Sequence, residues 1–399
     1  MRVMVVHNRR RSGAPSGENR VVDRERAALT SLGHEVIPFE RNSDEIERFS
    51  LPKKTALPAK VVWNNEVYRD LRRTLRKEQP DLVHVHNTFP LLSPAVLYAC
   101  RSAAVPVVTT LHNKRLICAG GNFFRAGVVC HDCIDGPATQ AVVHGCYNRS
   151  RVATAPVMLA TSAHRRAWRT MVSAYILLSE SQRHLLSAVG LEPDRVFVRH
   201  NLIPRRWPVS RARDTSVVYV GRLDEPKGLP ILMAGWDSYL SQHPQTELRL
   251  IIAGGGVLEA EVSAWAATRR SVDMIGYADE AQCTELMARA RAVLLPSACE
   301  ETFGLAAVEA MAVGTPPVAA AHGAFVELIT HGSDGMLFAP GDVPALTAAI
   351  ADIGGHPERY QAYGATARET YCKRFDPDRN IEQLLDIYRY AMKNPVFKA

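Results

Sequence analysis

Short apolar segments alternate with helical ones along this chain, and this alternation constrains the fold more than any other feature. It runs through RVMVVHN and DLVHVHN in the first half, and it starts again with SVVYVGRL and LRLIIAGGG in the second. Short apolar strands separated by helices are typical of a parallel sheet that is covered on both faces. The sequence therefore predicts an α/β protein with two Rossmann-like, doubly wound domains, and a length of 399 residues agrees with two cores.

The break between the two alternating regions predicts the domain boundaries. Residues 204–215 are rich in proline and arginine and lack periodicity, as expected of a linker. They separate an N-terminal domain at 1–203 from a C-terminal domain at 216–375. The last segment, 376–399, has the pattern of an amphipathic helix, which we expect to pack back on the N-terminal domain. Because ligands bind at the carboxyl ends of parallel strands, we expect the two domains to face a central cleft.

Charge is divided unevenly between the two halves. Up to Arg213 the chain has 33 basic against 17 acidic residues, a net charge of +16, and the remainder has 15 against 24, a net charge of −9. A basic first half favours an acidic partner such as nucleic acid, an anionic membrane surface or a phosphorylated substrate, although a merely soluble basic surface has the same composition. No apolar run reaches the ~18–20 residues of a membrane span, and the N-terminus lacks a signal-peptide pattern, so we expect a cytoplasmic protein.

Two cations follow the first strand of the second domain, in the segment VGRLDEPKG. Arg222 and Lys227 are thereby predicted to lie at the carboxyl edge of the sheet, where they could neutralise a diphosphate. An exposed loop with two solvated cations is the alternative. Gly254, in AGGG, would let a ligand approach the backbone closely, although a tight turn explains it equally well. No strand is followed by G-x-G-x-x-G, which disfavours a dinucleotide-dependent dehydrogenase.

Two glutamates stand in the segment EETFGLAAVEA. Glu301 is predicted to lie in a loop, and Glu309 in the second turn of the helix that follows. The backbone N–H groups of Phe303, Gly304 and Leu305 at the helix start would suit a phosphate or a sugar hydroxyl, and a carboxylate suits vicinal diols. Alternatively, the acidic residues only complement the helix dipole.

Four segments in order resemble the retaining glycosyltransferases of family 4, which have the GT-B fold of two Rossmann-like domains. GRLDEPKG is similar to the diphosphate-binding loop of that family, and ETFGLAAVEAMAVGTPPVA is similar to its E-x7-E segment. HGAFVELITHGSDGMLFAPGD resembles the segment after it, and SGAPSGENRVVDRERAALTSLGHEV resembles the N-terminal loop and helix. The resemblance extends over nearly the whole chain.

The resemblance implies a set of donor-binding residues. Arg222 and Lys227 would hold the donor diphosphate, Glu309 the ribose hydroxyls, and Glu301 the hydroxyls of the transferred sugar. The backbone of Phe303, Gly304 and Leu305 and the loop at Gly254 would add to this site. Gly17 falls where the family often has a glycine pair, but here the pair is Ser16 and Gly17, so close backbone approach is less certain there.

The resemblance also implies catalytic and acceptor-side residues in the first domain. His112, in TTLHN, matches a histidine near the reaction centre, and it would be catalytic together with Glu301, Arg222 and Lys227. A capping or packing role is the alternative for His112. The candidates for the acceptor side are His86, Asn87, Asn113 and Arg115.

The implied reaction moves a sugar from a UDP- or GDP-sugar to a glycan, a lipid-linked acceptor or a small molecule, with retention of the anomeric configuration. It would require no metal, and the D-x-D of Asp376 and Asp378 is better explained as the start of the last helix. A sugar-nucleotide 2-epimerase on the same fold is the alternative. The resemblance implies a role in polysaccharide biosynthesis. A polyprenyl-diphosphate-linked glycan as acceptor would bring a peripheral enzyme to the inner, anionic membrane surface.

Four cysteines are clustered within residues 113–150 of the first domain. Cys118, Cys130, Cys133 and Cys146 have the spacing C-x11-C-x2-C-x12-C. A structural zinc site is one reading, but strong zinc ribbons have two C-x2-C pairs, and reduced loop thiols are the alternative. A zinc-containing nucleic-acid-binding protein is a remote third interpretation. We expect no nucleic-acid partner, because the arginine clusters at 9–11 and 72–77 lack interleaved aromatic residues.

Overall fold

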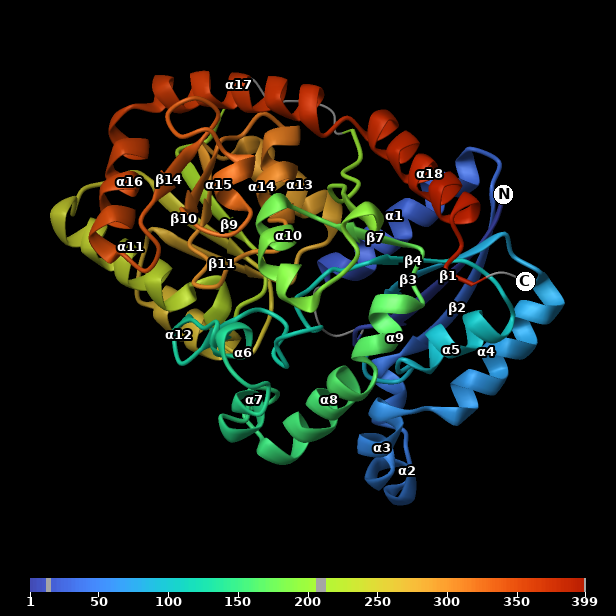
Figure 1. Cartoon of the computed structure of the whole chain (residues 1–399). Helices are drawn as coiled ribbons and strands as arrows, with labels where there is room; N and C mark the ends of the chain where they lie inside the picture. The colour runs from blue at the N-terminus through green and yellow to red at the C-terminus, as the bar shows by residue number, and fades with distance from the viewer. Residues whose placement is uncertain (12–15, 206–212, 398–399) are drawn as a thin grey trace. The chain divides into compact units, whose positions relative to one another are not determined.

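The computed structural model describes residues 1–11, 16–205 and 213–397, and these form two compact units (Figure 1). The first unit comprises Met1–Phe123, Cys130–Leu202 and Asp378–Ala399, and the second comprises Phe124–Val129 and Ile203–Pro377. Residues 206–212 of the predicted linker and residues 12–15 of the predicted N-terminal loop lie outside the described residues.

The first unit is built on a parallel sheet of six strands in the order β2-β1-β3-β4-β7-β8. The strands are β1 (Arg2–Arg9), β2 (Glu35–Asn42), β3 (Leu82–Asn87), β4 (Val107–Thr110), β7 (Ala174–Leu177) and β8 (Val196–Val198). The helices are α1 (Gly17–Ser31), α2 (Leu51–Thr55), α3 (Leu57–Val62), α4 (Asn65–Glu78), α5 (Ala95–Ser102), α6 (Asp132–Asp135), α7 (Gln140–Val143), α8 (Arg151–Ala163), α9 (Arg165–Thr170), α10 (Glu180–Leu186) and α18 (Pro377–Lys393). Three 3-10 helices are η1 (Ser43–Ile46), η2 (Ser187–Val189) and η3 (Pro193–Arg195).

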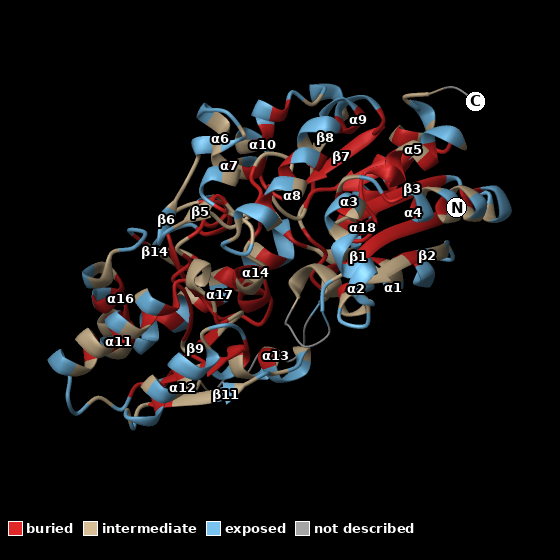
Figure 2. Ribbon diagram, turned by 90° about the horizontal axis from the view of Figure 1, so that it is seen from below, coloured by how far each residue is buried: buried red, intermediate tan, exposed pale blue. Residues whose placement is uncertain are grey.

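The inner strands β1, β3, β4 and β7 are buried along nearly their whole length because helices cover both faces of the sheet, whereas the edge strand β2 is mostly exposed or partly buried (Figure 2). Along β1, Met4 and Val6 belong to the core cluster shared with α4, α5 and α9. Val3 and Val5 point to the other face, into the cluster shared with α1 and α18. Side chains in a strand alternate between faces, so an uninterrupted apolar run is buried only if helices cover both. The last helix of the chain, α18, supplies part of that cover.

The second unit repeats this architecture with a parallel sheet of six strands in the order β11-β10-β9-β12-β13-β14. The strands are β9 (Ser216–Val220), β10 (Arg249–Ala253), β11 (Val272–Gly276), β12 (Ala292–Leu295), β13 (Pro317–Ala320) and β14 (Met336–Phe338). The helices are η4 (Glu225–Lys227), α11 (Leu229–Gln242), α12 (Glu259–Ala267), α13 (Glu280–Arg289), α14 (Leu305–Ala312), α15 (Phe325–Leu328), α16 (Val343–Gly355) and α17 (Pro357–Arg374). A short hairpin of β5 (Phe124–Arg125) and β6 (Val128–Val129) also belongs to this unit.

Two α/β units with parallel sheets confirm the predicted fold class. In both sheets the strand order reverses beside the first strand, β1 or β9, and such a switch point is where ligands bind in open α/β sheets. Among the described residues, no helix combines the length and the apolar character that crossing a membrane requires.

Candidate functional site

The predicted cations and the first predicted glutamate meet at the carboxyl edge of the second sheet. β9 and β12 are paired neighbours, so the loops that follow them lie side by side. The Lys227 ammonium donates to Glu301 Oε1 at 2.6 Å, and Ser297 Oγ donates to the same oxygen at 2.7 Å. The two loops are also joined by their backbones, since the N–H groups of Ala298 and Cys299 donate to the Pro226 carbonyl. The structure thus brings residues 74 positions apart in sequence into one ion pair.

Arg222 lies beside this pair. Its Nη2 is 2.8 Å from Asp224 Oδ2, and about a third of its side chain is exposed. Among the described residues, neither Arg222 Nε nor Asp224 Oδ1 has a hydrogen-bond partner, although both atoms are buried. Unsatisfied buried donors of this kind are costly, and an anionic ligand would satisfy the guanidinium.

The local electrostatics keep Glu301 ionised. Burial on its own would raise the pKa of Glu301, but the nearby Lys227 ammonium, the Ser297 hydroxyl and the Arg222 guanidinium outweigh that effect and lower the pKa below its usual value. The Glu301 carboxylate is therefore a hydrogen-bond acceptor at neutral pH. A carboxylate in this state cannot act as a general acid.

Two glycines shape the edge of this site. Gly304 caps α14 with φ of +82°, a conformation that favours glycine, and a Cβ there would be 2.6 Å from the Phe325 ring. At Gly254, a Cβ would be 1.8 Å from the Gly221 carbonyl oxygen. The backbone that comes close to Gly254 is therefore that of the neighbouring strand-end loop. This packing requirement explains the glycine without a ligand.

The second glutamate occupies a different environment from the first. α14 begins at Leu305, and Glu309 is in its second turn, as predicted, with 4% of its surface exposed. The Phe303 side chain is also buried, with its ring 6.4 Å from that of Phe375. The backbone N–H groups at the first turn of α14 have no acceptor within the helix, so Gly304 and Leu305 can offer them to a ligand.

In the first unit, three of the four predicted acceptor-side residues line one cavity together with His112. β3 and β4 are neighbours, so Asn87, the last residue of β3, and His112, two residues after β4, meet at the carboxyl edge of this sheet. The cavity has a volume of about 80 Å³, and Asn113 and Arg115 also line it. The remaining lining is mainly apolar: Val61, Phe89, Leu111, Leu116, Val157 and Trp168. That volume accommodates a few waters or one functional group of a ligand.

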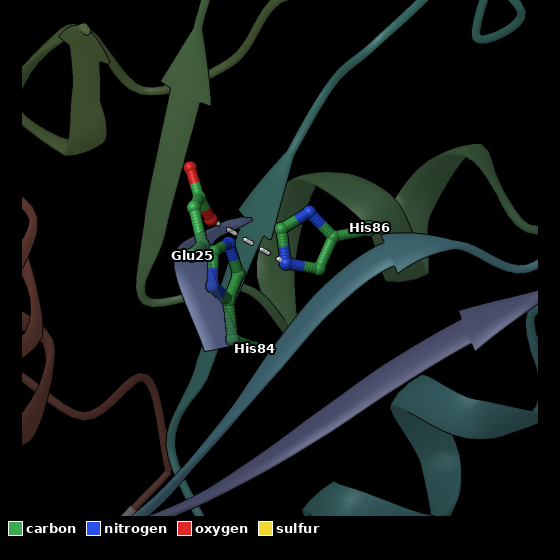
Figure 3. A group of neighbouring side chains, drawn as sticks. All are labelled: Glu25, His84 and His86. Atoms are coloured by element: carbon green, nitrogen blue, oxygen red, sulfur yellow. Dashed lines mark ion pairs between the residues drawn. The ribbon is translucent and has the colours of Figure 1, made fainter. Parts of the chain in front are cut away.

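His86, the fourth predicted acceptor-side residue, lies behind His112. Its side chain is 1% exposed, and it is not among the residues that line the cavity. Its Nδ1 is 2.9 Å from Nε2 of His112, and its Nε2 is 3.7 Å from Oε2 of Glu25 (Figure 3). His86 thus contacts His112 and Glu25, and its place on the acceptor side stays a prediction.

Arg115 connects the cavity to the segment that contains the cysteines. Its Nη1 donates to the Ala119 carbonyl at 2.6 Å, and its Cζ is 4.4 Å from the Phe89 ring centroid and 5.6 Å from that of Tyr147. Its backbone N–H donates to Asn113 Oδ1. A guanidinium stacked on two rings is well placed to fix a loop.

The four cysteines lie in this segment, with Cys118 buried and the other three partly buried. Burial, followed by the neighbouring Cys118 and Cys146, raises the pKa of Cys133 to about 11, so this thiol is protonated. Among the described residues, only Glu25, His84 and His86 form a group of three or more possible metal ligands within 4.8 Å of one another. No three of the four sulfur atoms form such a group, although Cys118, Cys146 and Cys130 all act electrostatically on Cys133. Zinc stays a prediction for metal analysis of the purified protein.

The N-terminal part of α1 carries one predicted residue and one that sequence reasoning missed. Gly17 is the first residue of α1, and the Ser16 hydroxyl caps the helix by accepting from the Asn19 N–H. Glu18 follows it, with its Oε1 3.9 Å from Nδ1 of His7. Burial raises the pKa of Glu18 to about 7, against the opposing effects of Arg10, Arg115 and Asn87. The Glu18 carboxyl lies near Arg115 and Asn87 of the cavity, and only its place after the N-terminal loop could have pointed to it in the sequence.

Comparisons with known protein families divide the chain near the predicted linker. The model described as Glycosyltransferase Family 4 matches residues 15–206, and the model described as Glycosyl transferases group 1 matches residues 206–370.

Among curated relatives, a glycogen synthase of Mycobacterium tuberculosis is 28% identical over 76% of this chain and 67% of its own length. A phosphatidyl-myo-inositol mannosyltransferase of Mycobacterium leprae is 26% identical over 83% and 79%. Among solved structures, Anabaena HepE in complex with UDP and glucose has a TM-score of 0.67 at 19% identity, covering 97% of this chain and 98% of its own. A glycosyltransferase of Rickettsia africae has a TM-score of 0.69 at 15% identity, covering 98% and 99%.

Proposed function

The chain belongs to the GT-B glycosyltransferases of the family 4 type, and we propose that it transfers a sugar from a nucleotide-diphosphate donor with retention of the anomeric configuration. The observation that carries this proposal is the cluster of Arg222, Lys227 and Glu301 beside the start of α14. It places two cations, one ionised acceptor and a helix N-terminus where the β9 and β12 loops meet.

Each group has a role that its chemistry supports. Lys227 and Arg222 would neutralise the charge that develops on the leaving diphosphate, as preorganised cations do in phosphate-transferring and acyl-transferring sites. Glu301 would accept from hydroxyls of the transferred sugar, and Glu309 from those of the ribose. Lys227 is bound to Glu301, so a diphosphate at Lys227 would compete with this carboxylate and leave it to accept from the sugar. No metal is needed in this scheme.

A UDP-sugar is the donor that the comparisons favour. The solved structures of Anabaena HepE include complexes with UDP and with UDP-glucose. A 2-epimerase is the less favoured reading, because the curated relatives are named as synthases and glycosyltransferases.

The surface of the first unit supports a lipid-linked acceptor at an anionic membrane. α3 packs against both α2 and α8. These helices expose large apolar side chains, with Leu51 79%, Val152 81% and Leu159 57% exposed. Lys53 and Lys54 of α2 are exposed beside Leu51. Apolar side chains mixed with cations are typical of a surface that binds anionic lipids, so the acceptor would be a polyprenyl-diphosphate-linked glycan.

A screen of UDP- and GDP-sugars tests the donor. We expect one nucleotide sugar to raise the melting temperature of the protein and to be hydrolysed slowly without an acceptor, with EDTA causing no loss of activity. Retention is read from the anomeric coupling constants of the glycoside product. A protein that neither binds nor consumes any nucleotide sugar contradicts the proposal.

A further inference from the structure

A line of buried polar contacts leads away from His112 into the first unit. Nε2 of His112 is 2.9 Å from Nδ1 of His86, whose Nε2 faces Glu25 Oε2 at 3.7 Å (Figure 3). The other oxygen of Glu25 accepts from Arg199 Nη1 at 2.6 Å. Arg199 in turn donates to the side-chain and backbone oxygens of Asn380 in α18. The line therefore joins β3, α1 and α18 with His112 after β4 and Arg199 after β8.

A metal ion is the first alternative for this cluster, because Glu25, His84 and His86 have ligand atoms within 4.8 Å of one another. Both ring nitrogens of His84 are already engaged, Nδ1 with the Tyr388 hydroxyl at 2.7 Å and Nε2 with Thr110 Oγ1 at 2.8 Å. The Arg199 guanidinium occupies one carboxylate oxygen of Glu25 and would repel a cation. Within the described part of the chain, only Glu25 Oε2 and His86 Nε2 of this cluster are left without a hydrogen bond, too few ligand atoms for a metal, so the cluster does not fit one.

Arg199 pairs with Glu25 through Oε1, and the other carboxylate oxygen, Oε2, lies 3.7 Å from Nε2 of His86 without a hydrogen-bond partner among the described residues. An oxygen of an ion-paired carboxylate can only accept, so a proton on Nε2 of His86, facing Oε2, is favoured over a lone pair there. His86 Nδ1 then carries a lone pair, and it must accept from Nε2–H of His112. Because a neutral imidazole has one proton, Nδ1 of His112 is left with a lone pair.

We propose that Glu25 and His86 are positioning residues that fix His112 in the Nε2–H tautomer, with Nδ1 as a hydrogen-bond acceptor for a substrate hydroxyl. Burial keeps both rings neutral, since it lowers the pKa of His112 to about 3 and that of His86 well below its usual value. Neighbouring His7, His84 and Arg199 act in the same direction. His112 lines the cavity, so the fixed lone pair is on the ring that a ligand can reach.

This inference rests on the proposed function only for the identity of the hydroxyl, which belongs to the acceptor or to the transferred sugar. The tautomer itself is a property of the free protein. The two can therefore fail separately. A neutral histidine of fixed tautomer accepts a proton or a hydrogen bond without reorganisation, which is the task of the orienting carboxylate in a catalytic triad.

Nitrogen-15 NMR of the full chain labelled at histidine tests the proposal, with the His112 signals assigned by their loss in His112→Asn. We expect protonated Nε2 and unprotonated Nδ1 in the wild type. In Glu25→Gln the amide oxygen would stay with Arg199 and the amide NH2 would face His86, so the proton of His86 moves to Nδ1 and that of His112 to Nδ1. We expect this inverted tautomer in the variant, and a kcat lower by about tenfold or more with little change in donor KM.

Two further variants guard against a folding defect. His86→Leu removes the acceptor for His112 while keeping an apolar filling, and we expect a mixture of His112 tautomers. Tyr388→Phe removes the hydroxyl from His84, outside the line from His112 to Glu25, and we expect an unchanged tautomer and activity within about twofold. A wild-type Nδ1–H tautomer, a tautomer unchanged in Glu25→Gln and His86→Leu, or a stoichiometric metal on His86 would overturn the proposal. The predicted tautomers without transferase activity would overturn the proposed function alone.

Discussion

Lys227, paired with Glu301, is the cation whose loss we expect to reduce catalysis most. Lys227 Nζ and Glu301 Oε1 are 2.6 Å apart, and Lys227 lies in η4, within the loop that follows β9. We expect Lys227→Ala to lower kcat/KM by about a hundredfold or more, because a preorganised cation for the leaving diphosphate is lost.

Steady-state kinetics with the donor found in the screen measure this effect. Lys373→Ala is the matched control, since Lys373 forms a comparable but exposed pair with Glu369 on α17, and its loss should leave kcat/KM within about twofold. Near-normal turnover by Lys227→Ala would remove Lys227 from the site.

Glu18 gives the first unit a pH-dependent stability. Its pKa is raised from 4.5 in the unfolded chain to about 7 in the folded one by burial, so the folded state binds the proton more tightly. Its contribution to stability is therefore largest below pH 4.5 and is lost as the pH rises to 7. Glu18→Gln mimics the protonated form, and at pH 8 we expect it to raise the melting temperature of the first unit by about 2–4 °C.

Calorimetry at pH 5 and pH 8 checks the sign. The gain from Glu18→Gln should shrink at pH 5, where the wild type is itself protonated. Glu66→Gln, an exposed glutamate of α4, should give no pH-dependent gain. Equal gains at both pH values would assign the effect to something other than ionisation.

At the residue scale, the sequence predicts residues whose place after a strand already marks them as candidates. Arg222, Lys227 and Glu301 follow strands of a recognisable alternating pattern, and their proximity follows from the pairing of β9 with β12. Glu18 and Glu25 could not be found in this way, because acidic residues within a helix usually face solvent. Their partners are His7, 11 positions before Glu18, and His86 and Arg199, 61 and 174 positions after Glu25.

At the element scale, long periodic segments were predictable and short irregular ones were not. The strands of both sheets and helices such as α1, α13 and α18 have clear apolar periodicity. The helices α6, α7 and α8 around the cysteines had no clear signal: α6 and α7 have four residues each, and α8 contains Pro156 in its interior. These helices form because they pack against the rest of the unit, and their own sequences have little tendency to be helical.

The exposed apolar side chains of α8 and α2 lead to a prediction about membranes. We expect the wild type to bind vesicles that contain anionic lipid, and to lose most of that binding at 1 M salt, where the Debye length falls to about 3 Å. Leu159→Asp replaces an exposed apolar side chain with a negative charge, so it should weaken vesicle binding about tenfold or more.

Vesicle sedimentation with increasing salt measures both effects. The matched control is Val257→Asp, which changes an 88% exposed valine in the second unit and should leave vesicle binding unchanged. Binding that is indifferent to salt, or equally sensitive to both substitutions, would argue against an anionic membrane surface at α2 and α8.

At the scale of the whole molecule, neither unit is continuous in sequence. The first unit contains Met1–Phe123, Cys130–Leu202 and residues from Asp378 onward, so the last helix of the chain covers part of its sheet. Sequence periodicity predicted α18 as an amphipathic helix, but it could not identify the partners, which are Tyr388 with His84 and Asn380 with Arg199. These contacts join residues 304 and 181 positions apart, respectively.

This discontinuity predicts that a lesion in the last helix destabilises the beginning of the chain. Leu384 is fully buried in the cluster with Val3 and Val5, so Leu384→Asp would bury a charge and lose packing there. We expect the free energy of unfolding of the first unit to fall by at least about 3 kcal/mol. Hydrogen exchange should accelerate in β1 and β3 while β9 and β12 stay protected, because the second unit has its own core. Glu382→Ala, an exposed position of α18, serves as the control, and equal acceleration in both sheets would show that the two units unfold as one.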